Sequence, residues 1–259
     1  MIGTFGTKLN ARSVALVRRL DVGMPRIMML WVLIASFIAG LRAAAPITPV
    51  TPGIDQFLQA LPYLLVVAAP VGTLLLALEA FPANRLYAQP AIRLARYGKW
   101  RAVDCLSSRT MPMFGATGLM ASLLLGMLLN IPVRAVEFML AMPALGGEAP
   151  SWLSTLFAAM LADVVVMTSL YALAFVMALR HVPWFPRFLL LVWSLDVLSQ
   201  LGIAQIVVAA RDLPADVAHQ LSNLLEGNLK KVLISVALWL PYLLLSRRVN
   251  LTYRQRVPA

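Results

Sequence analysis

The stretch Trp152–Leu179, WLSTLFAAMLADVVVMTSLYALAFVMAL, decides the fold class of this chain. It contains one charged residue, Asp163, in a run that is otherwise apolar or weakly polar. A helix needs about 20 apolar residues to cross a bilayer at 1.5 Å per residue, because lipid offers no partner to an unpaired backbone group. The stretch therefore predicts a transmembrane helix.

Five other segments meet or approach this length of apolar sequence. Composition agrees, because 61% of the residues are hydrophobic and 13% are charged, whereas soluble domains carry roughly 25% charged residues. The sequence predicts an all-α polytopic membrane protein, with two helices and a basic loop in residues 1–111 and a four-helix domain in residues 112–259. The six predicted spans lie near 27–45, 60–80, 112–132, 152–179, 188–210 and 230–246.

The distribution of positive charge predicts the orientation. Of the 22 Lys and Arg residues, five fall on one side of the predicted spans and the other 17 on the opposite side. Lys and Arg are enriched in cytoplasmic loops, so we expect both termini to be cytoplasmic. The five residues on the outer side are Arg42, Arg134, Arg211, Lys230 and Lys231.

The first span has a competing interpretation as a cleaved secretory signal. A basic start, an apolar run from Ile27 to Gly40 and small residues at 43–45 all fit such a signal. Pro46 would directly follow the cleaved bond, where its ring disfavours processing. We therefore predict a retained first helix.

The net charge of +11 follows from this topology. In a soluble protein it would suggest nucleic acid, but cations that flank membrane spans need only anionic lipid headgroups as partners. We predict contact with anionic lipid and with other membrane proteins or a second copy, and no nucleic-acid partner.

The loop 81–109 predicts a basic amphipathic helix on the membrane surface, since apolar and basic residues alternate after Pro90. A docking surface for a partner is the alternative. On the outer side, Asp212-Leu213-Pro214 predicts the start of a surface helix that runs into the last span. The basic residues predicted at the lipid interface are Arg93, Arg96, Lys99, Arg101, Arg247 and Arg248.

Few groups suit metal or catalytic chemistry. Cys105 is the single cysteine, and His181 and His219 are the two histidines. They are too few for a Cys-based metal cluster, a haem pair or a zinc triad without carboxylate help. The sequence also has no nucleophile–base set and no phosphate-binding loop, so we predict no metal, no cofactor and no enzymatic activity.

Asp163 and Asp196 are the two ionisable residues well inside the predicted spans, each about 13–17 Å deep at 1.5 Å per residue. A short turn makes their helices antiparallel neighbours, so the carboxyls can meet. Ser199 and Gln200 extend the polar stripe. Near the outer end of the third span, Arg134 and Glu137 are spaced for an interfacial ion pair with each other.

Two roles are open for this predicted cluster of Asp163, Asp196, Ser199 and Gln200. Two neighbouring acids can share and pass a proton or bind a cation. Alternatively, neutral carboxyls can hydrogen-bond across helices and hold the bundle together. Intramembrane aspartyl proteases also use two aspartates, but their Gly-x-Gly-Asp signature is absent at both positions.

The end of the last span contains a distinctive pattern of aromatic, proline and basic residues. It resembles the closing signature of a family of four-helix bacterial inner-membrane proteins of unknown function: Trp-x-Pro-Tyr, three residues, then Ser-x-Arg-Val-x-x-Thr-aromatic. The resemblance would cover residues 112–253 and implies a bacterial inner membrane, but no activity. The matching residues are Trp239, Pro241, Tyr242, Ser246, Arg248, Val249, Thr252 and Tyr253.

Physical reasoning gives this signature an architectural role. Pro241 removes a backbone donor and can kink the helix, and Trp239 and Tyr242 can pack beside it. The sequence as a whole favours a non-enzymatic accessory, assembly or scaffold component of a membrane complex. The alternative is a proton- or cation-coupled transporter of a small solute that uses Asp163 and Asp196.

Overall fold

The computed structural model describes residues 2–48, 53–92, 98–146, 149–210 and 213–259. In these residues six helices are long and apolar enough to cross a membrane, which confirms the predicted all-α polytopic class. A short helix α3 (Cys105–Thr110), a final helix α8 (Arg247–Arg254) and the strands β1 (Trp100–Ala102) and β2 (Arg256–Pro258) complete the fold. The six long helices are α1 (Ile2–Ala43), α2 (Ile54–Ala80), α4 (Leu119–Ala141), α5 (Ser151–Leu179), α6 (Phe185–Ala209) and α7 (Ala215–Leu245).

The third span is shifted along the sequence from its predicted position. The predicted start at residue 112 is wrong, because residues 111–118 form a turn in which Gly115 and Gly118 have φ values of 103° and 65°. The predicted end at 132 is also wrong, because α4 continues through Pro132 to Ala141. Prolines are tolerated in membrane helices when neighbouring groups satisfy the freed backbone. The shift places Arg134 inside a spanning helix.

The last span and the predicted outer helix are one continuous helix, α7. Pro214 precedes its first residue, as the sequence predicted, and Asp212 lies outside the described residues. Asn228, Lys230 and Lys231 therefore lie within a long helix and not at its start.

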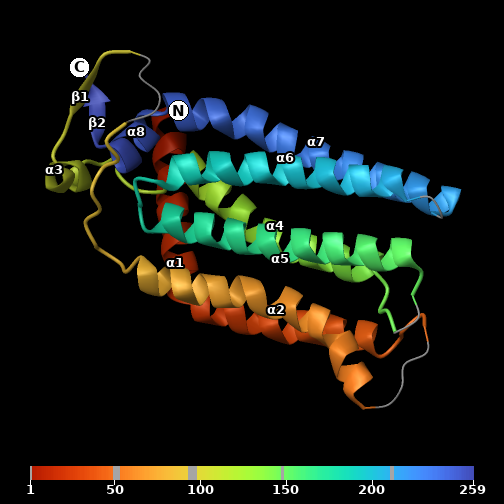
Figure 1. Cartoon of the computed structure of the whole chain (residues 1–259). Coiled ribbons are helices and arrows are strands. Elements are labelled where there is room, and N and C mark those ends of the chain that lie inside the picture. Colours follow the sequence, from red (N-terminus) through yellow and green to blue (C-terminus); the bar gives the residue numbers. More distant parts are fainter. Residues whose placement is uncertain (1, 49–52, 93–97, 147–148, 211–212) are drawn as a thin grey trace.

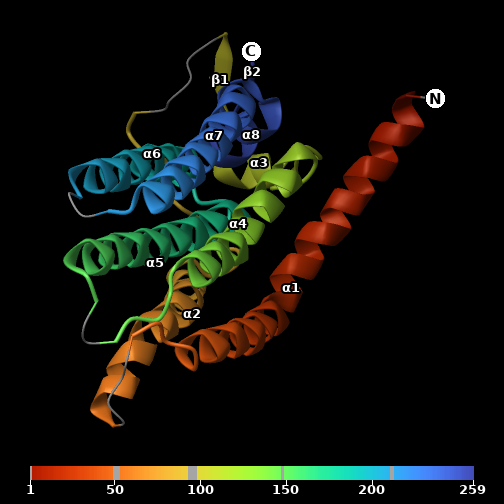
Figure 2. The same ribbon diagram turned by 90° about the vertical axis from the view of Figure 1, so that its right-hand side faces the viewer.

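The long helices form a bundle in which α5 lies among α2, α4 and α6, and α7 packs on α6 (Figure 1). Both termini lie toward the same end of the bundle, the end that also carries α3, α8 and the two strands (Figures 1 and 2). This agrees with an even number of crossings; that this end is cytoplasmic stays a prediction. Two clusters of buried side chains form the core, and each draws residues from both sides of residue 111. The division into two domains also stays a prediction.

Helix α1 is long and bent (Figure 2). Pro25 lies inside it, and a proline removes one helical hydrogen bond and favours a kink. On one side of Pro25, Asp21 forms an ion pair with Arg180 at 3.0 Å. On the other side, the Trp31 indole donates to the carbonyl of Val67 at 3.1 Å. The bend thus lets α1 contact both the α5–α6 turn and α2.

The predicted surface helix in the basic loop is wrong where the structure describes it. Lys99 and Arg101 are exposed, but Trp100–Ala102 is a strand that pairs antiparallel with Arg256–Pro258. Gly98 has a φ of 86°, which lies outside the right-handed helical region. Arg93 and Arg96 lie outside the described residues.

The C-terminal signature forms α8, which turns back into the end of the bundle. Ser246 caps this helix by accepting from the Val249 amide at 3.5 Å. Thr252 accepts from the Gly115 amide at 3.0 Å, and the Tyr253 hydroxyl donates to the Ala178 carbonyl at 2.8 Å. These bonds tie α8 to the α4 turn and to α5.

The remaining signature residues have mixed surroundings. Trp239 and Tyr242 pack edge to face at 6.0 Å between ring centroids; that they pack beside a kink at Pro241 stays a prediction. Arg247 is exposed, whereas Arg248 is half-buried and donates to Thr117 and to Asn10 at the end of the bundle. The basic pair was predicted at the lipid interface; the structure gives Arg248 two protein partners.

The turn before α4 offers a test of the fold. Gly118 has φ 65° and ψ −135°, a conformation that side chains strongly disfavour. A β-carbon there would also lie 3.5 Å from Nε of Arg248. We expect Gly118→Ala to lower the free energy of unfolding by about 1–3 kcal/mol, measured by unfolding in detergent. The control is Gly202→Ala on α6, where an added β-carbon meets nothing within 4 Å; an equal loss in both variants would contradict this account.

His181 makes stability depend on pH. It is the second residue of the α5–α6 turn and has a φ of 57°, and its Nε2 accepts from the Ala116 amide at 3.3 Å. Burial, with smaller contributions from Arg109 and Arg180, lowers the pKa of His181 from 6.5 to about 4. Between these values the unfolded chain binds more protons, so stability falls as pH drops through this window, by up to about 1.4 kcal/mol per pH unit.

The matched variant is His181→Asn, because asparagine tolerates a positive φ and does not titrate. Thermal unfolding in detergent between pH 4 and pH 8 compares the two proteins. We expect a shallower loss of stability below pH 6.5 in the variant. Identical profiles would show that another group causes the acid sensitivity.

Candidate functional site

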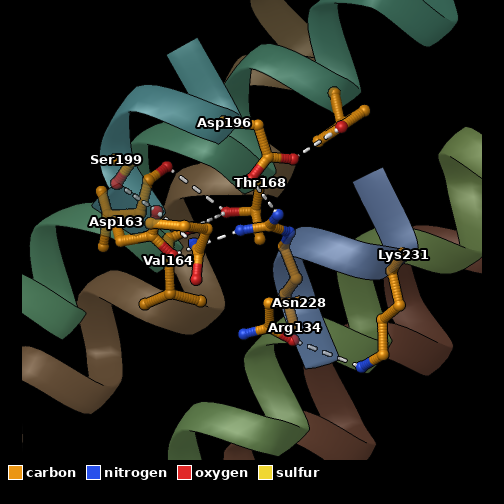
Figure 3. Close-up of polar contacts among 11 residues, drawn as sticks. Arg134, Asp163, Val164, Thr168, Asp196, Ser199, Asn228 and Lys231 are labelled. Atoms are coloured by element: carbon orange, nitrogen blue, oxygen red, sulfur yellow. Dashed lines mark hydrogen bonds and ion pairs between the residues drawn. The ribbon is translucent and has the colours of Figure 1, made fainter. Parts of the chain in front are cut away.

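Three charged side chains from three helices meet inside the bundle (Figure 3). Arg134 of α4 lies between Asp163 of α5 and Asp196 of α6. Its Nη1 is 3.2 Å from Asp163 Oδ2, and its Nη2 donates to Asp196 Oδ1. The Arg134 and Asp163 side chains are 11% and 10% exposed and that of Asp196 is fully buried. We call these three residues the charged triad.

Neutral groups complete the hydrogen bonding of both carboxylates. Asp163 Oδ1 accepts from Ser199 at 2.5 Å and from Gln200 Nε2 at 3.4 Å. The Tyr171 hydroxyl donates to Asp196 Oδ2 at 2.8 Å. The structure thus brings together all four predicted residues, Asp163, Asp196, Ser199 and Gln200, although Ser199 and Gln200 bind Asp163 and not Asp196.

The triad has more negative than positive charge. Two carboxylates surround one guanidinium, so the fully ionised triad would carry a net charge of −1 in a largely buried place. Buried charge without compensation is costly. A proton shared within the triad, or a cation bound next to it, would remove this imbalance.

The triad lies well inside the helices. Asp163 is 12 residues from the start of α5 and Asp196 is 11 residues from the start of α6, which places them about 16–18 Å along these helices. Arg134 is seven residues before the end of α4, or about 10 Å. All three side chains therefore lie well within helices that are long and apolar enough to cross a membrane.

The pair of Arg134 and Glu137 predicted from the sequence is wrong. Glu137 instead accepts from Lys231 of α7 at 2.6 Å, where both side chains are partly exposed. Arg134 points toward the two aspartates because the extension of α4 beyond Pro132 carries it into the bundle. Asn130, Arg134 and Glu137 are spaced along one helical face, which indicates that the helix continues past Pro132. The predicted end of the span at residue 132 excluded this interpretation.

A cavity of about 140 Å³ lies beside the triad, between α4 and α7. Its charged lining residues are Arg134, Asp196, Glu137 and Lys231, and Tyr171 also lines it. Asn130, Asn228 and Ser235 add polar groups. The rest of the lining is apolar or aromatic: Leu123, Gly126, Met127, Val133, Trp193, Val232 and Trp239.

The described residues contain no group of three or more His, Cys, Asp or Glu side chains that could hold a metal ion. Cys105 is a free cysteine in the short helix α3. His181 Nε2 accepts a hydrogen bond from the Ala116 amide, and His219 contacts Asn223 at 3.2 Å near the start of α7.

No family model, no curated protein and no solved structure matches this chain. The family resemblance of the C-terminal signature therefore stays a prediction.

Proposed function

We propose that this chain is a non-enzymatic, multi-pass protein of a bacterial inner membrane that couples the movement of a small solute to a proton. The observation that carries the proposal is the charged triad inside the bundle, because two of its members, Arg134 and Asp196, line a cavity between spanning helices. Ionisable residues in membrane spans are expensive and commonly mark ion and proton pathways. Arg134 supplies the basic partner that such pathways often include.

The cavity would hold a solute next to the triad. Asp196 is fully buried in the protein, yet it lines the cavity together with Arg134. A solute there could alter the charge around the carboxylate and so its protonation. This contact is the physical basis for coupling solute binding to proton binding.

The test uses purified protein in lipid vesicles with an imposed pH gradient. The vesicles are incubated with a small-molecule extract of the source cells, and accumulated solutes are identified by mass spectrometry. We expect at least one solute to accumulate only with the gradient, and Asp163→Asn and Asp196→Asn to lower its accumulation tenfold or more. The control is Asp216→Asn, in the exposed first turn of α7. Equal solute levels with and without the gradient would refute the proposal.

A second candidate function is an accessory or scaffold component of a membrane complex. The observation that favours it is that the triad carboxylates have five protein donors between them, as a clamp joining three helices would need. This role predicts that Asn is tolerated at 163 and 196, whereas Leu destabilises the bundle. It also predicts a stoichiometric partner after purification from native membranes in mild detergent.

A further inference from the structure

The charged side chains that line the cavity between α4 and α7, taken together with Asp163 behind Arg134, carry one more negative than positive charge. The lining and the triad behind it contain the cations Arg134 and Lys231 and the anions Glu137, Asp163 and Asp196. Glu137 and Lys231 neutralise each other in one ion pair at 2.6 Å. The net charge that remains is that of the triad, which has two carboxylates and one guanidinium. A bound cation would therefore be favoured over a bound anion.

The apolar part of the lining restricts what kind of cation fits. Trp193, Trp239 and Tyr171 contribute aromatic rings, and Leu123, Met127 and Val232 contribute aliphatic surface. Aromatic rings attract cations through their negative faces, and organic ammonium ions are the usual ligands of such surroundings. A metal ion would instead need several oxygen ligands, and the described residues contain no group of three or more His, Cys, Asp or Glu side chains that could hold one.

The size of the cavity indicates what kind of group it can take in. A cavity of roughly 150 Å³ holds a molecule of the size of benzene, and this cavity measures about 140 Å³. The charged group that enters it is therefore small, with about as many non-hydrogen atoms as benzene.

We propose that the α4–α7 cavity binds a small monovalent organic cation, with the excess carboxylate of the charged triad as its counterion. The inference rests on the proposed function and names the substrate class of the same site. Because the cation and a proton compensate the same negative charge, binding of one opposes binding of the other. The coupling is then an exchange of cation for proton.

The experiment measures binding of tetramethylammonium to the full chain in detergent by titration calorimetry, in weakly buffered solution with a pH electrode. We expect saturable binding that weakens at acidic pH and releases protons into the medium. tert-Butanol has the same number of non-hydrogen atoms but no charge, and we expect it to bind at least tenfold more weakly. Acetate tests for an anion.

Two variants locate the site. Gly126 lines the cavity, and a β-carbon added there meets nothing within 4 Å. Gly126→Leu should therefore fill the cavity and reduce tetramethylammonium affinity at least tenfold without unfolding the chain. The matched control is Gly202→Leu on α6, where an added β-carbon also meets nothing within 4 Å and which does not line the cavity; it should bind as the wild type does.

The outcomes separate this inference from the proposed function. Stronger binding of acetate than of tetramethylammonium, equal binding of tert-butanol, or equal loss in the Gly126 and Gly202 variants would overturn the cation site. Gradient-driven accumulation of a solute in vesicles by a protein that does not bind tetramethylammonium would overturn the cation site alone. Tetramethylammonium binding with proton release, in a protein that accumulates no solute in vesicles, would support the cation site and refute the proposed carrier.

Discussion

Replacement of Arg134 by leucine is expected to lower the free energy of unfolding by about 3–5 kcal/mol, because it removes the cation between two buried carboxylates. Asp163 would keep Ser199 and Gln200 as donors, and Asp196 would keep only Tyr171. The measurement is unfolding of the purified protein in detergent at pH 7, followed by circular dichroism. A loss below about 1 kcal/mol would mean that the ion pairs add no more than exposed ones do.

Two further variants distinguish the charge from its geometry. Arg134→Lys keeps the positive charge but cannot contact two carboxylates through a planar fork, so we expect an intermediate loss. Replacement of all three triad residues by leucine removes every buried charge at once. Because a buried ion pair often contributes little compared with apolar side chains of similar volume, we expect the triple variant to be more stable than Arg134→Leu. A triple variant less stable than Arg134→Leu would contradict this explanation.

The sequence predicted the helices better than their ends, and the ends determined what could be said about the site. Asp163 and Asp196 were recognisable because each stands alone in an apolar run. Arg134 was assigned to the outer loop because Pro132 resembles the end of a span, although α4 continues for nine residues after it. Hydropathy therefore located two members of the triad and missed the third.

The basic loop and the C-terminal segment show a second limit, since both depend on pairing between distant residues. An alternating basic and apolar pattern at 90–101 suits a surface helix, but a strand forms where β2 provides a partner about 155 residues later along the chain. Likewise, the sequence does not reveal that Val249, Thr252 and Tyr253 are buried against the end of the bundle. Local pattern cannot report such a partner.

Asn250 is a buried amide that joins two arginines at the end of the bundle. Its Oδ1 accepts from Arg254 Nη1 at 3.1 Å and from Arg256 Nε at 2.8 Å, and its Nδ2 donates to the Ser246 carbonyl at 2.9 Å. Asn250→Leu should lower the free energy of unfolding by about 3 kcal/mol, since hydrogen bonds to buried charged groups are lost. Unfolding in detergent at pH 7 measures the loss.

The control Asn250→Asp decides whether charge or shape is responsible. Burial, together with the nearby charges of Arg256 and Arg187, lowers the pKa of Arg254 to about 10, and the guanidiniums of Arg254 and Arg256 both donate to the same neutral oxygen. An aspartate keeps that oxygen and adds the opposite charge, which should draw both arginines closer. We therefore expect Asn250→Asp to be at least as stable as the wild type at pH 7. Equal destabilisation by Leu and Asp would instead assign the role of Asn250 to its Nδ2 donor, the only hydrogen-bonding group that both variants lose.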